Sequence, residues 1–143
     1  MTDTVLFEGT QLYQLIPQRE PIVMVSHVYQ ITDTDIKSGL LVKEDNIFCA
    51  NGKLTEPGLI EHIAQSAAAF AGYPFFVAGK QAPLGYIGEI KKLRIHQLPA
   101  AGSMLHTHIQ LVSEVMGISL ITAETTVNDT PVVSCQMKIF INE

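Results

Sequence analysis

Glu61 is the side chain in this sequence whose type and surroundings best suit acid–base chemistry. It lies between Ile60 and Ile63 in a stretch with helical spacing, and Gln65 follows four residues later on the same helix face. A carboxylate among apolar side chains is unfavourable unless it is paired, so such a group is either a satisfied structural residue or a reactive one. We predict that Glu61 is catalytic and that the Gln65 amide orients it.

The start of the same helix is a candidate binding site for a carbonyl oxygen. Gly58 and Leu59 fall in the predicted first turn, where backbone amides have no intrahelical acceptor and the helix dipole is positive. Such amides stabilise a carbonyl oxygen that gains negative charge. Every helix has such a start, so the alternative is that these two residues only begin the helix.

The histidines are placed less favourably for chemistry. His62 is about 100° around the helix from Glu61, so the two side chains should not converge, and we expect His62 at the helix surface or an interface. His106 and His108 are two residues apart on a predicted strand and share one face, a spacing that can ligate a metal. No third ligand has a suitable spacing, so we predict a solvated strand face and no metal site.

One long helix among strands must position these residues. Apolar side chains recur at helical spacing from Glu56 onward, and Gly72 followed by Pro74 should end the helix. The expected strands cover residues 21–32, 36–43, 86–97, 104–112, 118–127 and 132–141. We therefore predict one α+β domain over residues 1–143, in which an antiparallel sheet of five or six strands packs on one helix with an alanine-rich face.

The composition excludes several classes of protein. The chain has 143 residues, 47% of them hydrophobic, which is enough for a core without disulfides or a structural metal. A net charge of −5 argues against a nucleic-acid partner. The N-terminus lacks a secretory signal pattern, and the uncharged run over residues 63–79 is too short and too polar for a membrane span. Cys49 and Cys135 should stay unpaired in a reducing cytoplasm.

Four segments between about residue 12 and the end of the chain match the motifs of one enzyme family. Their sequences are L-I-P-Q-R-E-P-I-V-M-V (15–25), P-G-L-I-E-H-I-A-Q-S-A (57–67), G-Y-I-G-E-I-K-K-L-R (85–94) and P-A-A-G (99–102). In this order and spacing they resemble the beta-hydroxyacyl-acyl-carrier-protein dehydratases of the FabZ and FabA type. The resemblance implies the hotdog fold, in which a sheet wraps a central helix, and action on acyl thioesters.

The departures from that family bear on the chemistry. In the dehydratases that the chain resembles, a histidine before the helix abstracts the C2 proton, and the helix carboxylate acts as an acid at the 3-hydroxyl. Asn51 stands at the position of that histidine, in a loop four residues shorter, and Gln18 replaces a second histidine in the N-terminal motif. An amide can orient a hydrogen bond but cannot exchange a proton at neutral pH. We expect Asn51 and Gln18 to hold substrate or water, unless Asn51-Gly52 is only a turn.

Three functions are compatible with this sequence. The first is a dehydratase that converts a 3-hydroxyacyl thioester to an enoyl thioester, with Glu61 as acid or base and with Gly58, Leu59, Gln65 and Gln18 at the substrate. The second is a hotdog thioesterase in which Glu61 activates water or attacks the thioester. The third is a non-catalytic subunit that pairs with an active dehydratase. The resemblance favours the first, with no cofactor apart from the phosphopantetheine of an acyl carrier protein or coenzyme A that carries the substrate.

The expected partners are a second chain and a carrier protein. Pairing of exposed sheet edges would give a homodimer or a higher homo-oligomer, or a heterodimer with a related dehydratase. It would bring the loop over residues 44–54 near the neighbour's helix. By resemblance, Asn51 of one chain would then meet Glu61 of the other. Lys91, Lys92 and Arg94 are candidates for docking an acidic carrier protein, although strand alternation places Lys91 on the opposite face from the other two.

Overall fold

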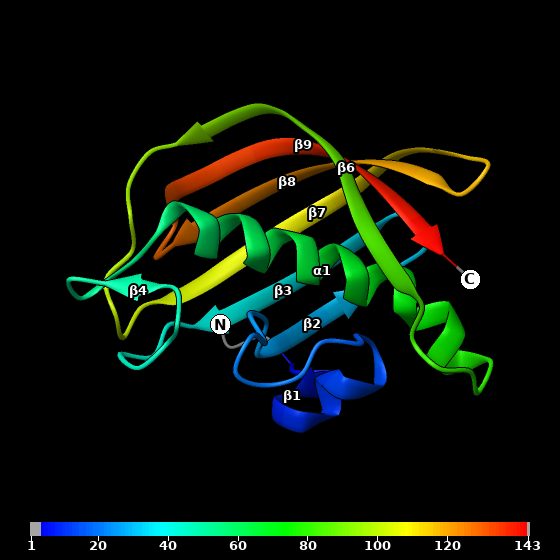
Figure 1. The fold of residues 1–143 in the computed structure, drawn as a ribbon, viewed down its shortest axis with the longest axis horizontal. Helices are drawn as coiled ribbons and strands as arrows, with labels where there is room; N and C mark the ends of the chain where they lie inside the picture. Colours follow the sequence, from blue (N-terminus) through cyan, green and yellow to red (C-terminus); the bar gives the residue numbers. More distant parts are fainter. Residues whose placement is uncertain (1–3, 143) are drawn as a thin grey trace.

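The computed structural model describes residues 4–142, which form a seven-stranded antiparallel sheet, one long helix and a small hairpin (Figure 1). The sheet has the strand order β1-β2-β3-β7-β8-β9-β6, and β4 pairs with β5 to form the hairpin. The elements are β1 (Phe7–Glu8), the 3-10 helix η1 (Gly9–Gln14), β2 (His27–Ile31), β3 (Asp35–Leu41), β4 (Cys49–Ala50), β5 (Lys53–Leu54), α1 (Glu56–Val77), β6 (Leu84–Ile95), β7 (Met104–Val115), β8 (Ile118–Val127) and β9 (Thr130–Asn142).

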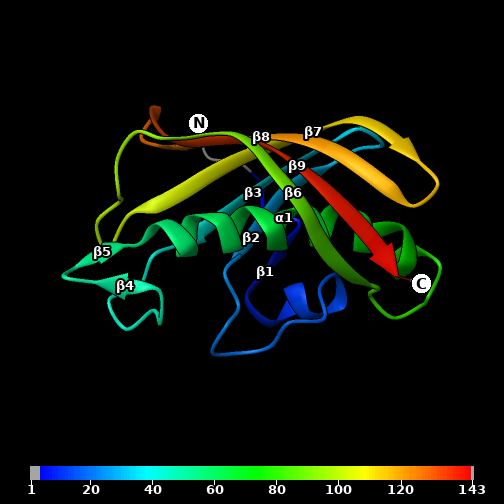
Figure 2. The ribbon, with the colours of Figure 1, turned by 45° about the horizontal axis from the view of Figure 1, so that its top comes forward.

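The sheet curves around α1, which is the arrangement predicted from the sequence (Figure 2). One strand more than expected is present, because the two-residue β1 is too short to produce an alternating pattern. In β9 the predicted alternation is confirmed, since Val133, Cys135, Met137 and Ile139 are buried in the core. Within the described residues, no helix combines the length and the hydrophobicity that a bilayer span requires.

The helix does not end at Gly72, as the sequence suggested, but continues to Val77. Gly72 is buried where α1 crosses the segment after η1, and a Cβ atom built there would lie 2.0 Å from the backbone oxygen of Leu15. The role of Gly72 is therefore to allow the helix to pack closely against Leu15, and it does not end the helix. Pro74 is exposed, where water can replace the hydrogen bond that a proline cannot donate.

The strand expected from residue 21 begins only at His27. In the preceding segment, Met24 bonds to side chains of α1, and among the segment's described residues only Ser26, directly before β2, donates to β3, from its N–H to the Gly39 carbonyl at 2.9 Å. The Met24 N–H donates to Gln65 Oε1 at 2.6 Å, and the Met24 carbonyl oxygen lies 2.7 Å from His62 Nδ1. The N-terminal motif is thus fixed against the helix beside Glu61.

Candidate active site

Gln65 holds Glu61 in place, as the four-residue spacing predicted. The Gln65 Nε2 group donates to Glu61 Oε2 at 2.7 Å and to the Ile22 carbonyl at 2.7 Å, while Gln65 Oε1 accepts from the Met24 N–H. The Met24 N–H can only donate, so it fixes which end of the buried Gln65 amide carries the oxygen. Glu61 itself is half-buried, and within residues 4–142 its Oε1 atom accepts no hydrogen bond.

A cavity of about 250 Å³ lies beside Glu61, between α1 and the strands β6 and β9. The alanines of α1 form one wall, because their small side chains leave space between the helix and the sheet. Among the described residues that line this cavity, Glu61 is the only carboxylate. The lining consists of Gln18, Glu61, Ala64, Ala68, Ala71, Pro83, Gly85, Tyr86, Ile87, Ile139 and Ile141.

Gln18 brings a second polar side chain to this cavity from the loop after η1. Its Oε1 atom is buried and has no hydrogen-bond partner within residues 4–142. The loop itself is well anchored, because the Arg19 guanidinium donates to the carbonyls of Ile16 at 2.9 Å and Gln18 at 2.8 Å. The structure therefore brings Glu61, Gln65 and Gln18 together.

The start of α1 differs in part from the expectation. The Leu59 N–H is not free, because it donates to the carbonyl of Thr55 at 3.1 Å, the first bond that a helix capped at Thr55 can make. The Gly58 N–H lies one residue earlier, so no carbonyl of the same helix is in position to accept from it. A Cβ atom at Gly58 would lie 2.7 Å from side-chain atoms of both Leu54 and Phe48, so the β4–β5 hairpin packs directly on the helix start.

Asn51 lies in the turn of the β4–β5 hairpin and is exposed. Asn51 and Gly52 have φ angles of 54° and 76°, as in the two-residue hairpin turns that favour Asn-Gly. Asn51 is not among the described residues that line the cavity beside Glu61. Within one chain, its observed role is that of a turn residue, and contact with the helix of a second chain stays a prediction.

His62 is fully buried in the core. The prediction of a position at the helix surface or an interface is therefore wrong. Its Nδ1 atom lies 2.7 Å from the Met24 carbonyl and its Nε2 atom 2.7 Å from Thr107 Oγ1. A carbonyl can only accept, so Nδ1 carries the proton and Nε2 accepts from Thr107. Burial lowers the pKa of His62 to about 4, although the Met24 hydrogen bond acts in the opposite direction. His62 is therefore a neutral structural group, distinct from the cavity.

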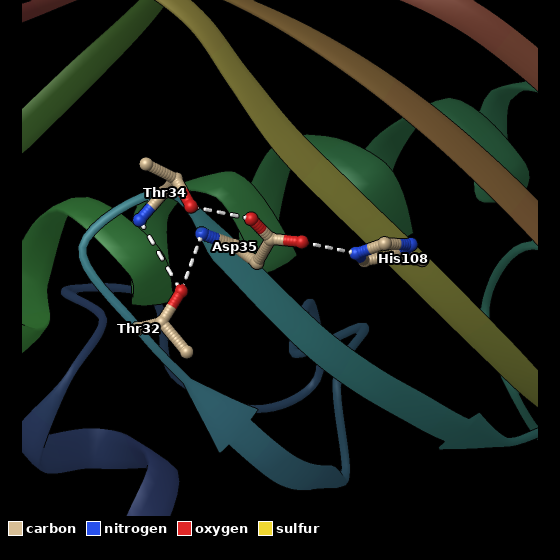
Figure 3. Close-up of polar contacts among 4 residues, drawn as sticks. All are labelled: Thr32, Thr34, Asp35 and His108. Atoms are coloured by element: carbon tan, nitrogen blue, oxygen red, sulfur yellow. Dashed lines mark hydrogen bonds and ion pairs between the residues drawn. The ribbon is translucent and has the colours of Figure 1, made fainter.

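His106 and His108 share a strand but have separate partners. His108 Nε2 lies 2.6 Å from Asp35 Oδ2, while Thr34 Oγ1 donates to Asp35 Oδ1 at 2.6 Å (Figure 3). The hydrogen bond from Thr34, followed by that from His108, lowers the pKa of Asp35. His106 is exposed and stacks on the Tyr29 ring. No group of three or more His, Cys, Asp or Glu side chains suited to a metal ion occurs in the described part of the chain.

The basic residues of β6 do not follow simple alternation. A bulge between Lys91 and Arg94 pairs Lys91 with Gln136 and Arg94 with Ser134, which puts Lys91 and Arg94 on the same face. The expectation that Lys91 faces away from Arg94 is therefore wrong. The extra residue of the bulge turns Arg94 to the face on which Lys91 lies. Lys91 also pairs with Glu89 at 3.1 Å, which partly offsets its charge.

The curated proteins that match this chain include two dehydratases of similar length. The chain is 25% identical over 130 residues to the 3-hydroxyacyl-[acyl-carrier-protein] dehydratase FabZ of Lactiplantibacillus plantarum, covering 87% of this chain and 86% of the relative. It is 24% identical over 148 residues to the FabZ of Lactococcus lactis subsp. lactis, covering 100% and 96%.

Comparison with solved structures and family models agrees with the fold. A chain of the dehydratase heterocomplex ApeI:P from Xenorhabdus doucetiae superimposes with a TM-score of 0.85 at 18% identity, over 92% of this chain and 91% of the other. A hypothetical thioesterase protein with coenzyme A from Streptococcus pneumoniae TIGR4 gives a TM-score of 0.60 at 10% identity, over 80% and 84%. The predicted hotdog fold is confirmed. The model of the ApeP-like family, described as ApeP dehydratase, matches residues 10–143, and the chain therefore belongs to this family.

Proposed function

We propose that this chain is a subunit of a 3-hydroxyacyl-thioester dehydratase and that Glu61 transfers a proton in the reaction. The observation that carries the proposal is the position of Glu61, half-buried at an apolar cavity and held by Gln65 at 2.7 Å. A carboxylate that is oriented before substrate binds loses little freedom when it reacts. Family membership supports the same reaction class.

The elimination breaks two bonds of the acyl group and forms one. A base takes the proton from C2, and the electron pair of that C–H bond becomes the C2–C3 double bond. The hydroxyl leaves C3 and receives a proton, so that water departs. In this proposal Glu61 protonates the leaving hydroxyl, the acyl chain lies along the alanine face of α1, and the Gly58 amide polarises the thioester carbonyl.

The base that removes the C2 proton is proposed to come from a second chain. Among the described strands, none covers the outer edge of the 12-residue β6, and Tyr86 and Leu93 there are 54% and 40% exposed. Pairing along this edge would bring a neighbour's β4–β5 hairpin toward Glu61. Asn51 cannot act as a base, so the active partner in this proposal is a related dehydratase with a histidine at that position. The likeness to a dehydratase heterocomplex supports such a pair.

The substrate in this proposal arrives on phosphopantetheine, carried by an acidic carrier protein or as coenzyme A. Lys91, Lys92 and Arg94 are the proposed docking residues, supported by the shared face of Lys91 and Arg94 beside the open edge. We propose the cytoplasm as the location, in agreement with the unpaired Cys49 and Cys135.

A thioesterase is the second candidate, favoured by the carboxylate–amide pair of Glu61 and Gln65. The test is an assay of the chain, alone and together with a dehydratase from the same cells, on 3-hydroxyacyl and saturated acyl thioesters. An enoyl product that forms much faster in the mixture supports the proposal. Free thiol from both substrates supports the thioesterase, and enoyl formation that is unaffected by the presence of this chain supports a non-catalytic subunit.

A further inference from the structure

We propose that Gln18 Oε1 accepts a hydrogen bond from the 3-hydroxyl of the substrate, so that the cavity selects hydroxylated acyl chains over saturated ones. This inference rests on the proposed function. Its starting point is an unsatisfied atom, since Gln18 Oε1 is the buried side-chain oxygen without a hydrogen-bond partner in residues 4–142. Buried polar atoms are nearly always paired, and an exception at a cavity calls for an explanation.

The buried amide of Gln65, in the same region, is fully paired, in contrast to Gln18 Oε1. Both polar atoms of the Gln65 side chain are engaged, by the backbone of Ile22 and Met24 and by Glu61. The cavity beside Gln18 is lined mainly by apolar side chains, and the hydroxyl that Tyr86 brings to the lining is not bonded to the Gln18 oxygen. A ligand that enters the cavity is therefore the natural source of that donor.

The backbone around Gln18 keeps its side chain at the cavity. Arg19 is bonded to the carbonyls of Ile16, Gln18 and Tyr13, and its guanidinium lies 4.4 Å from the centre of the Tyr13 ring. Pro17 restricts the preceding residue. A loop held in this way keeps residue 18 in place, and Gln18 and Glu61 both line the cavity.

The chemistry of an acyl thioester leaves one suitable donor near the reacting carbons. A saturated or an enoyl chain carries only C–H groups there, whereas a 3-hydroxyacyl chain carries an O–H group. That hydroxyl can donate to Gln18 Oε1 while its own oxygen accepts a proton from Glu61, so the two residues do not compete. A site built around such a bond binds an analogue without the hydroxyl less tightly, because the buried oxygen is then left unpaired.

The test compares the binding of two unreactive analogues by titration calorimetry. Both are pantetheine amides of the same chain length, one with and one without the 3-hydroxyl, and the protein is used in its native assembly. We expect the wild type to bind the hydroxylated analogue about tenfold or more tightly. Gln18→Met keeps the length of the side chain but removes the acceptor, so the preference should disappear while the affinity for the saturated analogue stays the same.

Two further variants make the result specific. Gln18→Leu should behave as Gln18→Met does, and Gln81→Met, at an exposed position outside this cavity, should keep the wild-type preference. Equal binding of the two analogues by the wild type, or a preference that survives in both Gln18 variants, overturns the inference but leaves the proposed function intact. Failure of the wild type to bind either analogue overturns the proposed function together with this inference.

Discussion

Acidification should destabilise this protein through His62 in particular. The folded-state pKa of His62 is about 4, against 6.5 for an unperturbed histidine. The unfolded chain therefore binds a proton at a higher pH than the folded chain does, so the contribution of His62 to stability is present above about pH 6.5 and is lost as the pH falls toward 4. The full difference, at about 1.4 kcal/mol per pKa unit, is about 3 kcal/mol.

The assay is urea unfolding of the wild type and of His62→Gln at pH 7 and at pH 5. A glutamine does not titrate but can still donate to the Met24 carbonyl and contact Thr107, the two partners of His62. Between pH 7 and 5, linkage gives a loss of about 2 kcal/mol in the wild type that the variant should lack. The lowered pKa of Asp35 acts below this range, and it affects both proteins equally. Identical pH dependence of the two proteins would refute the assignment of His62 as a buried neutral group.

Three further predictions concern packing, assembly and docking. Gly72→Ala should lower the free energy of unfolding by about 1–3 kcal/mol, measured by urea titration, because its Cβ would overlap the Leu15 carbonyl oxygen; a variant as stable as wild type would contradict this packing. In the absence of another partner, β6 should pair with a second copy, so sedimentation should give twice the 15.7 kDa chain mass rather than a monomer. Charge reversal at both Lys91 and Arg94, which share a face, should raise the KM for a carrier-bound substrate at low salt and leave the KM for a pantetheine thioester unchanged. A KM for the carrier-bound substrate equal to that of the wild type would exclude docking here.

Local patterns in the sequence predicted the parts of the structure that depend on neighbouring residues. The Glu61–Gln65 contact follows from a four-residue helical spacing, and the buried face of β9 follows from strict alternation. The Asn51-Gly52 turn is equally local. These features need no knowledge of how distant segments meet, so the sequence alone was sufficient for them.

The errors arose where distant segments decide the outcome. His62 is buried because its ring nitrogens bond to the Met24 carbonyl and the Thr107 hydroxyl, 38 and 45 residues away, and no helical pattern reveals those partners. Gly72 followed by Pro74 is a typical end of a helix, and the sequence pattern does not reveal that Gly72 instead packs against Leu15 of another segment. Whether Lys91 and Arg94 share a face depends on a single extra residue between them in β6, because that residue moves every later side chain to the opposite face. The sequence likewise could not predict that Gln18 Oε1 is buried without a hydrogen-bond partner, because this depends on which distant groups lie around it.

The central claim, that Glu61 carries the proton transfer, is tested most directly by the dehydration rate of Glu61→Gln in the native assembly. The amide keeps the size of the carboxylate and its hydrogen bonding but cannot titrate, so the rate should fall by about 10²- to 10⁴-fold, with an unchanged melting temperature. Glu56→Gln, at the exposed first position of the same helix, is the matched control and should keep the wild-type rate. A Glu61→Gln protein that forms the enoyl thioester as fast as the wild type would contradict the account.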